Sequence, residues 1–377
     1  MTAPLDGLLV ADFSRVLAGP FATMHLADLG ARVVKVERPG TGDETRSWGP
    51  PWTERSSAYF DCVNRSKQSI TLDLSDPGDR DVARELAERA DVLVENFLPG
   101  TMARYGLDHP TLARSNPGLI YCSISGFGSA AGASAPGYDF LVQAVGGLMS
   151  ITGDAAGEPT KVGVALVDVL TGKDAVIGIL AALARRASTG QGDRIEVSLL
   201  SSLLGGLVNQ AASYLTTGQA PSRQGNRHPS ITPYESFPCA DAPIAIACGN
   251  DAQFARLVAA IGLPELGDDA RFATNPARVQ HREELAGLLS TRLRTRSSHE
   301  WESTLTAAGV PAGLVQDIGS AIGRAEELGL NPLIQLEDGS RHIRHPILFT
   351  HAGTARPTTP PTLGEHSNEV RQWLAER

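Results

Sequence analysis

The first part of the chain alternates short apolar runs with amphipathic runs, and this alternation constrains the fold more than any other feature. Residues 8–13 (LLVADF) are typical of a buried strand, residues 21–30 (FATMHLADLG) of a helix that ends at a glycine, and residues 32–38 (RVVKVER) of a second strand. A strand, a helix and a strand in this order predict parallel strands joined by a right-handed crossover.

The same alternation continues further along the chain. Residues 69–74 and 91–97 indicate two more strands, and residues 118–128 indicate another. Residues 75–90 predict a helix with Asp76 as its N-cap. We therefore predict an α/β fold class, with an open doubly wound parallel sheet domain in which helices cover both faces.

The pattern changes near residue 217, because residues 218–233 are polar and rich in proline and glycine. Short strands and several helices follow up to about residue 330, which predicts a smaller α+β domain. The expected organisation is a large α/β domain at 1–217, a linker and small domain at 218–330, and a C-terminal segment at 331–377 that returns to the large domain.

Composition excludes several classes of partner. The net charge is −9 and the basic residues are scattered, so no run of them suits nucleic acid. We find no signal peptide and no apolar run of membrane-spanning length, and we expect a cytoplasmic protein with no membrane partner. The four cysteines lack CxxC spacing and the nine histidines form no HxxxH or HExxH pattern, which predicts reduced thiols and no metal site.

The turn after the first strand does not have the sequence of a dinucleotide site. Residues 13–22 (FSRVLAGPFA) contain one glycine and no GxGxxG, so the glycines that bring a pyrophosphate close to the backbone are missing. Arg15 and Arg38 either serve another anionic ligand or are ordinary surface arginines.

Asp168 is the single charged residue in the apolar run 162–172 (VGVALVDVLTG). It could cap a helix, join a buried ion pair or act as a catalytic carboxylate, since an unpartnered buried charge is costly. Thr171 followed by Asp174 predicts a capping box, which makes the first role unnecessary. The small residues on the same helix face, from Gly172 onward, leave room for a ligand or for a closely packed helix.

Many ordered segments resemble the class III CoA-transferases, the carnitine–bile-acid (CaiB/BaiF) family. They are DFSRVLAGPFATMHLADLGARVVKVERPGTGDETRSWGPP, NRSKQSITLDL, DVLVENFLPGTMARYGLD, LIYCSISGFG, GYDFLVQAVGGLMSITG, VDVLTG, GNRHPSITPYESF, IAIACGNDAQF and LGEHSNEV. The resemblance implies an open α/β domain that binds CoA, a smaller domain, and two subunits interlocked as a homodimer. It places the family's catalytic aspartate on Asp168.

The resemblance also implies a reaction. CoA would pass from an acyl-CoA donor to a carboxylic acid through mixed-anhydride and aspartyl-CoA thioester intermediates at Asp168, with CoA as substrate and product and no permanently bound cofactor. The start of the chain, including SRVLAGP, is most similar to members that draw CoA from succinyl-CoA and load dicarboxylic acids.

The implied CoA contacts lie on three loops, on two separate arginines and on one leucine. They are Arg15, Val16, Leu17, Ala18, Arg38, Leu72, Asn96, Phe97, Arg104, Ala135, Pro136, Gly137 and Tyr138. Gly249 and Asn250 form a candidate oxyanion or substrate loop, although a plain strand end explains them equally well. Ser75 stands where formyl-CoA transferases carry lysine, Leu17 replaces their glutamine, and their glycine-rich flap has no counterpart, which argues against oxalate and formyl-CoA as substrates.

Two other functions stay open. The 2-methylacyl-CoA racemases belong to the same family and carry a histidine where this chain has Tyr138. A neutral tyrosine is a poor acid–base partner for an α-proton, so we favour a transferase. A non-catalytic CoA-binding protein would have no need of Asp168.

Overall fold

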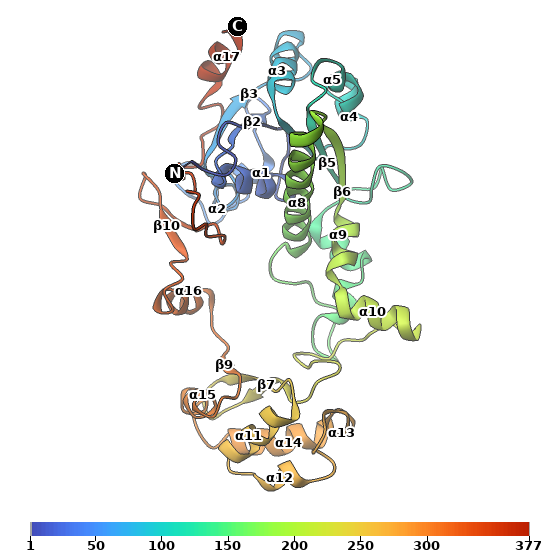
Figure 1. Ribbon diagram of the computed structural model, residues 1–377, viewed down its shortest axis with the longest axis vertical. Coiled ribbons are helices and arrows are strands. Elements are labelled where there is room, and N and C mark those ends of the chain that lie inside the picture. Colours follow the sequence, from blue (N-terminus) through green and yellow to red (C-terminus); the bar gives the residue numbers. More distant parts are fainter. Residues whose placement is uncertain (1, 377) are drawn as a thin grey trace. The chain divides into compact units, whose positions relative to one another are not determined.

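The computed structural model describes residues 2–376 (Figure 1). The chain divides into two compact units, one made of Met1–Leu148, Lys161–Ala220 and Asn331–Arg377, the other of Met149–Thr160 and Pro221–Leu330. The expected large domain, 1–217, includes residues 149–160, whereas in the structure these residues belong to the second unit. We keep the expected division as a proposal; its terminal residues, 1 and 377, lie outside the described residues.

The first unit contains a six-stranded sheet in the order β3-β2-β1-β4-β5-β6, and every pair in it is parallel. The strands are β1 (Leu9–Asp12), β2 (Arg32–Glu37), β3 (Lys67–Thr71), β4 (Val92–Glu95), β5 (Ile120–Ser125) and β6 (Asp193–Ser198). This confirms the predicted mixed α/β fold with a parallel sheet.

Helices cover both faces of the sheet because alternate strand residues carry apolar side chains to each face. On one face Val10 packs with α1 (Ala18–Asp28), α8 (Leu166–Thr189) and α9 (Leu199–Gly206). On the other face Leu9 packs with α3 (Pro77–Arg89), α5 (His109–Ser115) and α17 (Ser367–Ala375). The other helices before residue 220 are η1 (Glu44–Ser47), α2 (Ala58–Asp61), α4 (Thr101–Arg104), α6 (Asp139–Val145), α7 (Leu148–Ile151) and α10 (Val208–Thr217).

Local signals account for several boundaries. The carboxylate of Asp76 accepts a hydrogen bond from the backbone N–H of Asp79 at 2.9 Å, so the predicted cap of α3 is confirmed. Gly30 follows α1 with a φ of 107°, which a residue with a side chain adopts only at a cost.

The predicted start of the helix that contains Asp168 is wrong. α8 begins at Leu166 and not at Thr171, and the Thr171 hydroxyl donates to the carbonyl of Val167 at 2.8 Å instead of capping. Asp168 therefore lies in the first turn. A Cβ on Gly172 would lie 2.7 Å from the carbonyl oxygen of Ala18, so the small residues of α8 let α1 approach closely.

The C-terminal segment packs on the first unit. The backbone N–H of His366 donates to the carbonyl of Ser69 at 2.9 Å, beside β3. Arg89 on α3 donates to the carbonyl of Leu374 on α17 at 2.6 Å. The hairpin of β10 (Leu333–Gln335) and β11 (Arg341–Ile343) precedes these contacts.

The second unit is a smaller α+β arrangement. Its antiparallel sheet has the order β7-β8-β9, with β7 (Tyr234–Pro238), β8 (Pro243–Ala247) and β9 (Ala312–Leu314). Its apolar core gathers around the fully buried Trp301. The helices are α11 (Asp251–Ala260), α12 (Glu265–Asp268), α13 (Asn275–Gln280), α14 (Arg282–Leu293), α15 (Ser298–Ala307) and α16 (Ile318–Glu327).

Within residues 2–376, no helix has both the length and the apolar character needed to cross a membrane. The same residues contain no group of three or more histidine, cysteine or acidic side chains arranged to hold a metal ion.

Candidate functional site

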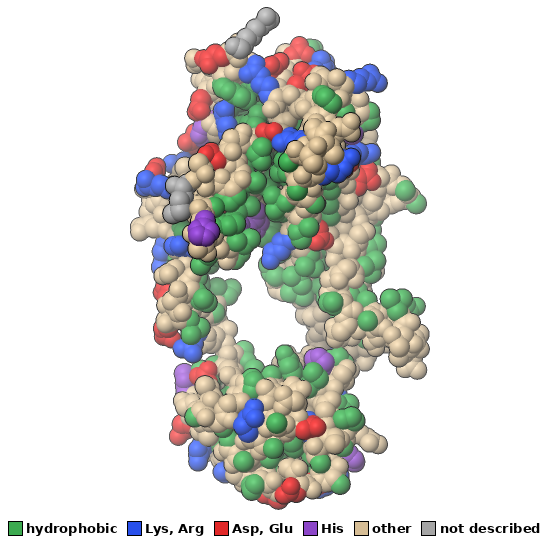
Figure 2. Space-filling model, viewed as in Figure 1, with side chains coloured by type: hydrophobic (Ala, Val, Ile, Leu, Met, Phe, Trp, Pro, Cys, Tyr) green, Lys and Arg blue, Asp and Glu red, His purple; other side chains and the backbone are tan. Residues whose placement is uncertain are grey.

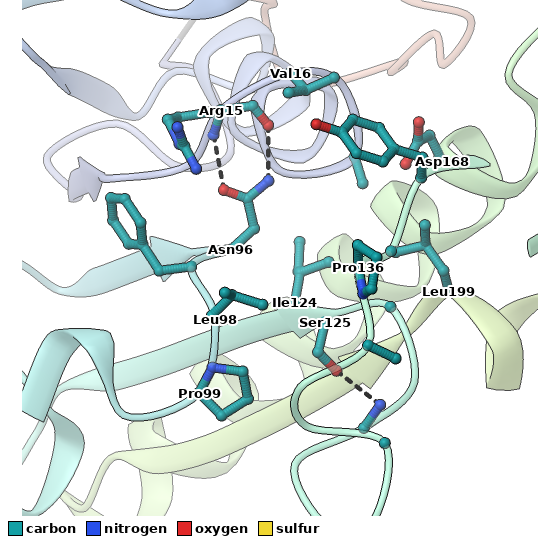
Figure 3. Close-up of a pocket in the computed structure, with 18 of the residues that line it drawn as sticks. Arg15, Val16, Asn96, Leu98, Pro99, Ile124, Ser125, Pro136, Asp168 and Leu199 are labelled. Atoms are coloured by element: carbon teal, nitrogen blue, oxygen red, sulfur yellow. Dashed lines mark hydrogen bonds between the residues drawn. The ribbon is translucent and has the colours of Figure 1, made fainter. Parts of the chain in front are cut away.

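The cavity of the first unit that Asp168 lines, called the main cavity below, lies where the strand order reverses, between β1 and β4. Ligands of open parallel sheets bind at the carboxyl ends of the strands at this point. The cavity has a volume of about 290 Å³ and is lined by the loops that follow β1, β4 and β5. Asp168 from α8 and Leu199 from α9 complete the wall (Figure 3).

The loop after β1 is clamped in a strained conformation. Val16 has a φ of 69°, in the left-handed region that β-branched residues avoid. On one side, the backbone N–H of Arg15 donates to Asn96 Oδ1 at 2.9 Å, and Asn96 Nδ2 donates to the Arg15 carbonyl at 2.7 Å (Figure 3). On the other side, the backbone N–H of Val16 donates to Asp43 Oδ2 at 3.2 Å.

A buried ion pair supports this clamp. Lys35 Nζ lies 2.9 Å from Asp43 Oδ2, and both side chains are fully buried. Lys35 also donates to the carbonyl of Ser14 at 2.8 Å. Burial by itself raises the pKa of Asp43, but the neighbouring Lys35 ammonium and hydrogen bonds from Thr45 outweigh it and hold that pKa below its usual range. Asp43 is therefore an ionised anchor for the loop.

Asp168 is 8% exposed, and it reaches the cavity from the first turn of α8. Burial, and secondarily the charge of Asp139, raises its pKa from 3.8 to about 7. Tyr59 on α2 lies close enough to Asp168 to interact with its charge. Burial, and then the Asp168 charge, raise the pKa of the Tyr59 hydroxyl to about 12. A weakly hydrated carboxylate of this kind is well suited to nucleophilic attack in its ionised form.

The loop after β5 closes the cavity from the side of the sheet. Gly126 and Gly137 touch through their backbones, since a Cβ built on Gly126 would lie 2.4 Å from the Cα of Gly137. The backbone N–H of Gly128 donates to Ser125 Oγ at 3.1 Å and fixes the start of the loop (Figure 3). The residues between the two glycines therefore form a loop with a pinched neck.

A larger groove of about 820 Å³ adjoins the cavity and shares Arg15, Glu44 and Phe97 with it. The Arg15 guanidinium lies 5.1 Å from the centre of the Phe97 ring and 2.7 Å from Glu44 Oε1. The groove runs past the carboxyl ends of β2 and β3, where Arg38 and Leu72 line it.

The structure brings most of the residues expected from the sequence into one place. Those that line the main cavity are Arg15, Val16, Leu17, Ala18, Asn96, Phe97, Ala135, Pro136, Gly137, Tyr138 and Asp168. Arg38 and Leu72 line the adjoining groove, together with Ser75. Arg104 is exposed on α4 and donates to the hydroxyl of Thr101, a residue of the groove wall, at 3.1 Å.

Gly249 and Asn250 belong to the second unit. Asn250 caps α11, because its Oδ1 accepts from the backbone N–H of Gln253 at 2.9 Å. The backbone N–H of Gly249 donates to Gln253 Oε1 at 2.7 Å. These bonds give both residues a structural role at the start of α11. Their part in catalysis stays a prediction.

The sequence interpretation missed Asp139 and Tyr59. Asp139 Oδ2 accepts hydrogen bonds from the backbone N–H groups of Val167 at 2.8 Å and Asp168 at 3.2 Å. The only signal was its place directly after Tyr138, which says nothing about a partner 29 residues away.

Comparisons with known proteins show the family. The family model described as CoA-transferase family III matches residues 5–367. The chain is 42% identical to a succinate–glutarate CoA-transferase of Agrobacterium fabrum, over 97% of this chain and 94% of that one. It is 44% identical to an acetyl-CoA:oxalate CoA-transferase of Acetobacter aceti, over 88% of this chain and 86% of that one. A crystal structure of a CaiB/BaiF family protein from Brucella suis superposes with a TM-score of 0.90 at 43% identity, covering 99% of this chain and 100% of that one.

Proposed function

The chain belongs to CoA-transferase family III and is a class III CoA-transferase, and we propose that it moves CoA from an acyl-CoA donor to a carboxylic acid with Asp168 as the covalent nucleophile. The observation that carries the proposal is the buried carboxylate of Asp168 at the strand-order reversal, in a cavity of about 290 Å³ lined by the loops after β1, β4 and β5. That is where an open parallel sheet binds its ligand.

The proposed reaction has four steps. A carboxylate oxygen of Asp168 attacks the thioester carbonyl of the donor, the C–S bond breaks, and a mixed anhydride and CoA thiolate form. The thiolate attacks the Asp168 carbonyl carbon and releases the donor acid, which leaves an aspartyl-CoA thioester. The acceptor carboxylate then attacks this thioester and frees the thiolate again. Finally the thiolate attacks the acyl carbonyl of the second anhydride, and Asp168 leaves as a carboxylate.

Aspartate suits this exchange because it serves as both nucleophile and leaving group. Its acidity in water, with a pKa of about 4, is close to that of the substrate acids, so no step is strongly uphill. A serine or cysteine would be the poorer leaving group. Each tetrahedral intermediate needs hydrogen-bond donors for its oxyanion.

CoA would lie across the groove and the cavity, which meet at Arg15 and Phe97. The nucleotide end would lie in the groove near Arg38 and Leu72, with Arg104 reaching a phosphate. The thioester end would lie at Asp168, between the clamped loop after β1 and residues 135–138 of the loop after β5.

For the substrates, we propose succinyl-CoA as the donor and a dicarboxylic acid as the acceptor. The Agrobacterium relative, named for succinate and glutarate, supports this pair. The Acetobacter relative is named for acetyl-CoA and oxalate, so the argument against oxalate depends on Leu17, Ser75 and the absent flap alone. Acetyl-CoA and oxalate therefore belong in the test.

We also propose that the enzyme is a homodimer with interlocked subunits. Figure 2 shows hydrophobic side chains gathered on the face of the first unit over α8, and Ile177 of that helix is 65% exposed. Leu348 in the C-terminal segment is 78% exposed. Apolar side chains left open on a helix and on a terminal segment are typical of surfaces that a second subunit covers. Sedimentation as a monomer at micromolar concentration would contradict this proposal.

We retain a cytoplasmic location as part of the proposal. The four cysteines all lie within the described residues and all are free thiols, which suits a reducing compartment.

The deciding experiment is a screen of carboxylic acids against succinyl-CoA and acetyl-CoA, with the product CoA esters followed by mass spectrometry. Hydroxylamine added during turnover should convert Asp168 to a hydroxamate, which peptide mass analysis detects. A racemase would instead exchange deuterium at the α-carbon of a 2-methylacyl-CoA and leave Asp168 unmodified. A non-catalytic CoA-binding protein would bind CoA and do neither.

A further inference from the structure

The start of α8 has no cap of its own. The residue at its N-cap position, Ala165, carries no side-chain oxygen, while the first turn of any helix leaves several backbone N–H groups without a partner inside the helix. Asp139 supplies the missing acceptor from α6, since its Oδ2 accepts from the N–H groups of Val167 at 2.8 Å and of Asp168 at 3.2 Å. A carboxylate here also interacts favourably with the helix dipole.

The capping carboxylate is itself braced. Gln143, one turn further along α6, is fully buried and donates from Nε2 to the other oxygen of Asp139, Oδ1, at 2.6 Å. The carbonyl oxygen of the Gln143 side chain accepts from the backbone N–H of Val162 at 2.9 Å. The Gln143 amide therefore has to present its N–H₂ group to the Asp139 carboxylate and its oxygen to the Val162 N–H.

We propose that Asp139 is the positioning residue of the nucleophile, holding the first turn of α8 through two backbone hydrogen bonds while Gln143 holds Asp139. This inference rests on the proposed function, because it takes Asp168 as the group that attacks the thioester. The main chain of Asp168 is one of the two groups held, so a shift of the Asp139 carboxylate moves the nucleophile directly. A displacement of about 1 Å in a reacting group is enough to lower a rate about a hundredfold.

The same carboxylate also acts through its charge. Burial contributes most to the raised pKa of Asp168, and the negative charge of Asp139 adds to it. From α2 the Tyr59 hydroxyl interacts electrostatically with Asp168, whereas α1 and α9 present Ala18 and Leu199 to the cavity. The other charged side chains that line the cavity, Arg15 and Glu44, pair with each other at 2.7 Å, and Tyr138 is the remaining titratable residue in its wall.

The test uses two substitutions that separate position from charge. Asp139→Asn removes the charge and puts an amide N–H₂ against the N–H₂ of Gln143, so the brace breaks. In the double variant Asp139→Asn with Gln143→Glu, the carboxylate introduced at position 143 accepts from the amide introduced at position 139 and from the backbone N–H of Val162. The negative charge is then carried at position 143 instead of position 139. Asp174→Asn, an exposed residue on α8, is the matched control.

With succinyl-CoA and glutarate, Asp139→Asn should lower kcat at alkaline pH by about tenfold and change KM by less than about threefold. The acid limb of its kcat profile should move to lower pH by about one unit. The double variant should recover kcat to within about threefold of the original. The assignment is wrong if Asp139→Asn leaves kcat and its pH profile unchanged, or if it changes KM alone.

A readout that needs no turnover separates this inference from the proposed function. The difference in unfolding free energy between the unmodified protein and its Asp168→Asn variant reports the ionisation of Asp168. The pH at which this difference levels off should fall when Asp139→Asn is present in both proteins, and the difference above that pH should shrink, because the unfolded chain fixes its onset. If CoA transfer is absent but this pH moves, the proposed function fails and the Asp139–Asp168 coupling stands. If CoA transfer is present and neither this pH nor the pH profile of kcat moves, the Asp139–Asp168 coupling is wrong and the proposed function stands.

Discussion

Replacing Asp168 by asparagine should stabilise the folded protein at neutral and alkaline pH while it abolishes CoA transfer. The pKa of Asp168 is raised from 3.8 to about 7, so the folded protein keeps this proton over a pH range in which the unfolded chain has already lost it. The stabilising contribution is complete below about pH 4 and disappears as the pH rises through about 7. Above that pH the folded protein carries a poorly solvated charge, which an asparagine removes.

The size of the effect follows from the shift. Each pKa unit corresponds to about 1.4 kcal/mol, so a shift of about three units sets a ceiling of about 4 kcal/mol. Asp168 retains 8% of its surface and lines an open cavity, which lowers the expectation to about 2–4 kcal/mol at pH 8. Near pH 4 the two proteins should differ little, because the carboxyl is then neutral in the folded state.

Urea unfolding followed by circular dichroism at several pH values measures this difference. The protein concentration is held fixed, since the unfolding of an oligomer depends on it. Asp174→Asn is the control, because an exposed carboxylate keeps its hydration in the folded state. If the Asp168→Asn difference is the same at pH 4 and pH 8, Asp168 titrates in the folded protein as it does in the unfolded chain, and the reasoning is wrong.

Three further predictions concern the groove, the clamp and the helix contact. Arg104→Ala should weaken CoA binding by about 1.5–3 kcal/mol, and calorimetry that shows no change would remove this arginine from the site. Asp43→Asn leaves the buried Lys35 without its ion-pair partner, so it should lower the free energy of unfolding by about 3 kcal/mol and raise KM for the acyl-CoA; an unchanged KM would contradict the clamp. Gly172→Ala should lower the melting temperature by the equivalent of about 1–3 kcal/mol through its clash with α1, whereas Gly287→Ala, at an open position of α14, should be neutral or stabilising.

The sheet could be predicted because its signals are local. Strands that are buried on both faces leave nearly continuous apolar runs such as residues 8–13, where Asp12 is the single charged residue, and a cap such as Asp76 acts on a backbone group three residues away. Asp168 could be singled out for the same reason, as one charge in an apolar run. The residues of the main cavity were named through a resemblance and not through spacing, since three separate loops bring them together.

The start of α8 could not be predicted because its cap comes from another helix. A rule that reads caps from neighbouring residues selects Thr171, whose hydroxyl in fact bonds back to its own helix. Asp139 acts across 28–29 positions of sequence, and no local pattern encodes that distance. The gap between sequence and structure is therefore widest beside Asp168, where a side chain from α6 caps the start of α8.

The pinched neck of the loop after β5 has a consequence for protein engineering. Gly126 and Gly137 meet backbone to backbone, and the bond from the Gly128 N–H to Ser125 Oγ also holds the start of the loop. Residues 129–136 thus form an exchangeable cassette, whose length and composition can vary without a change of register in β5. Because part of this cassette faces the cavity, a library built between two unchanged glycines would sample the shape of the cavity, while α8, which carries Asp168, keeps its packing on the sheet.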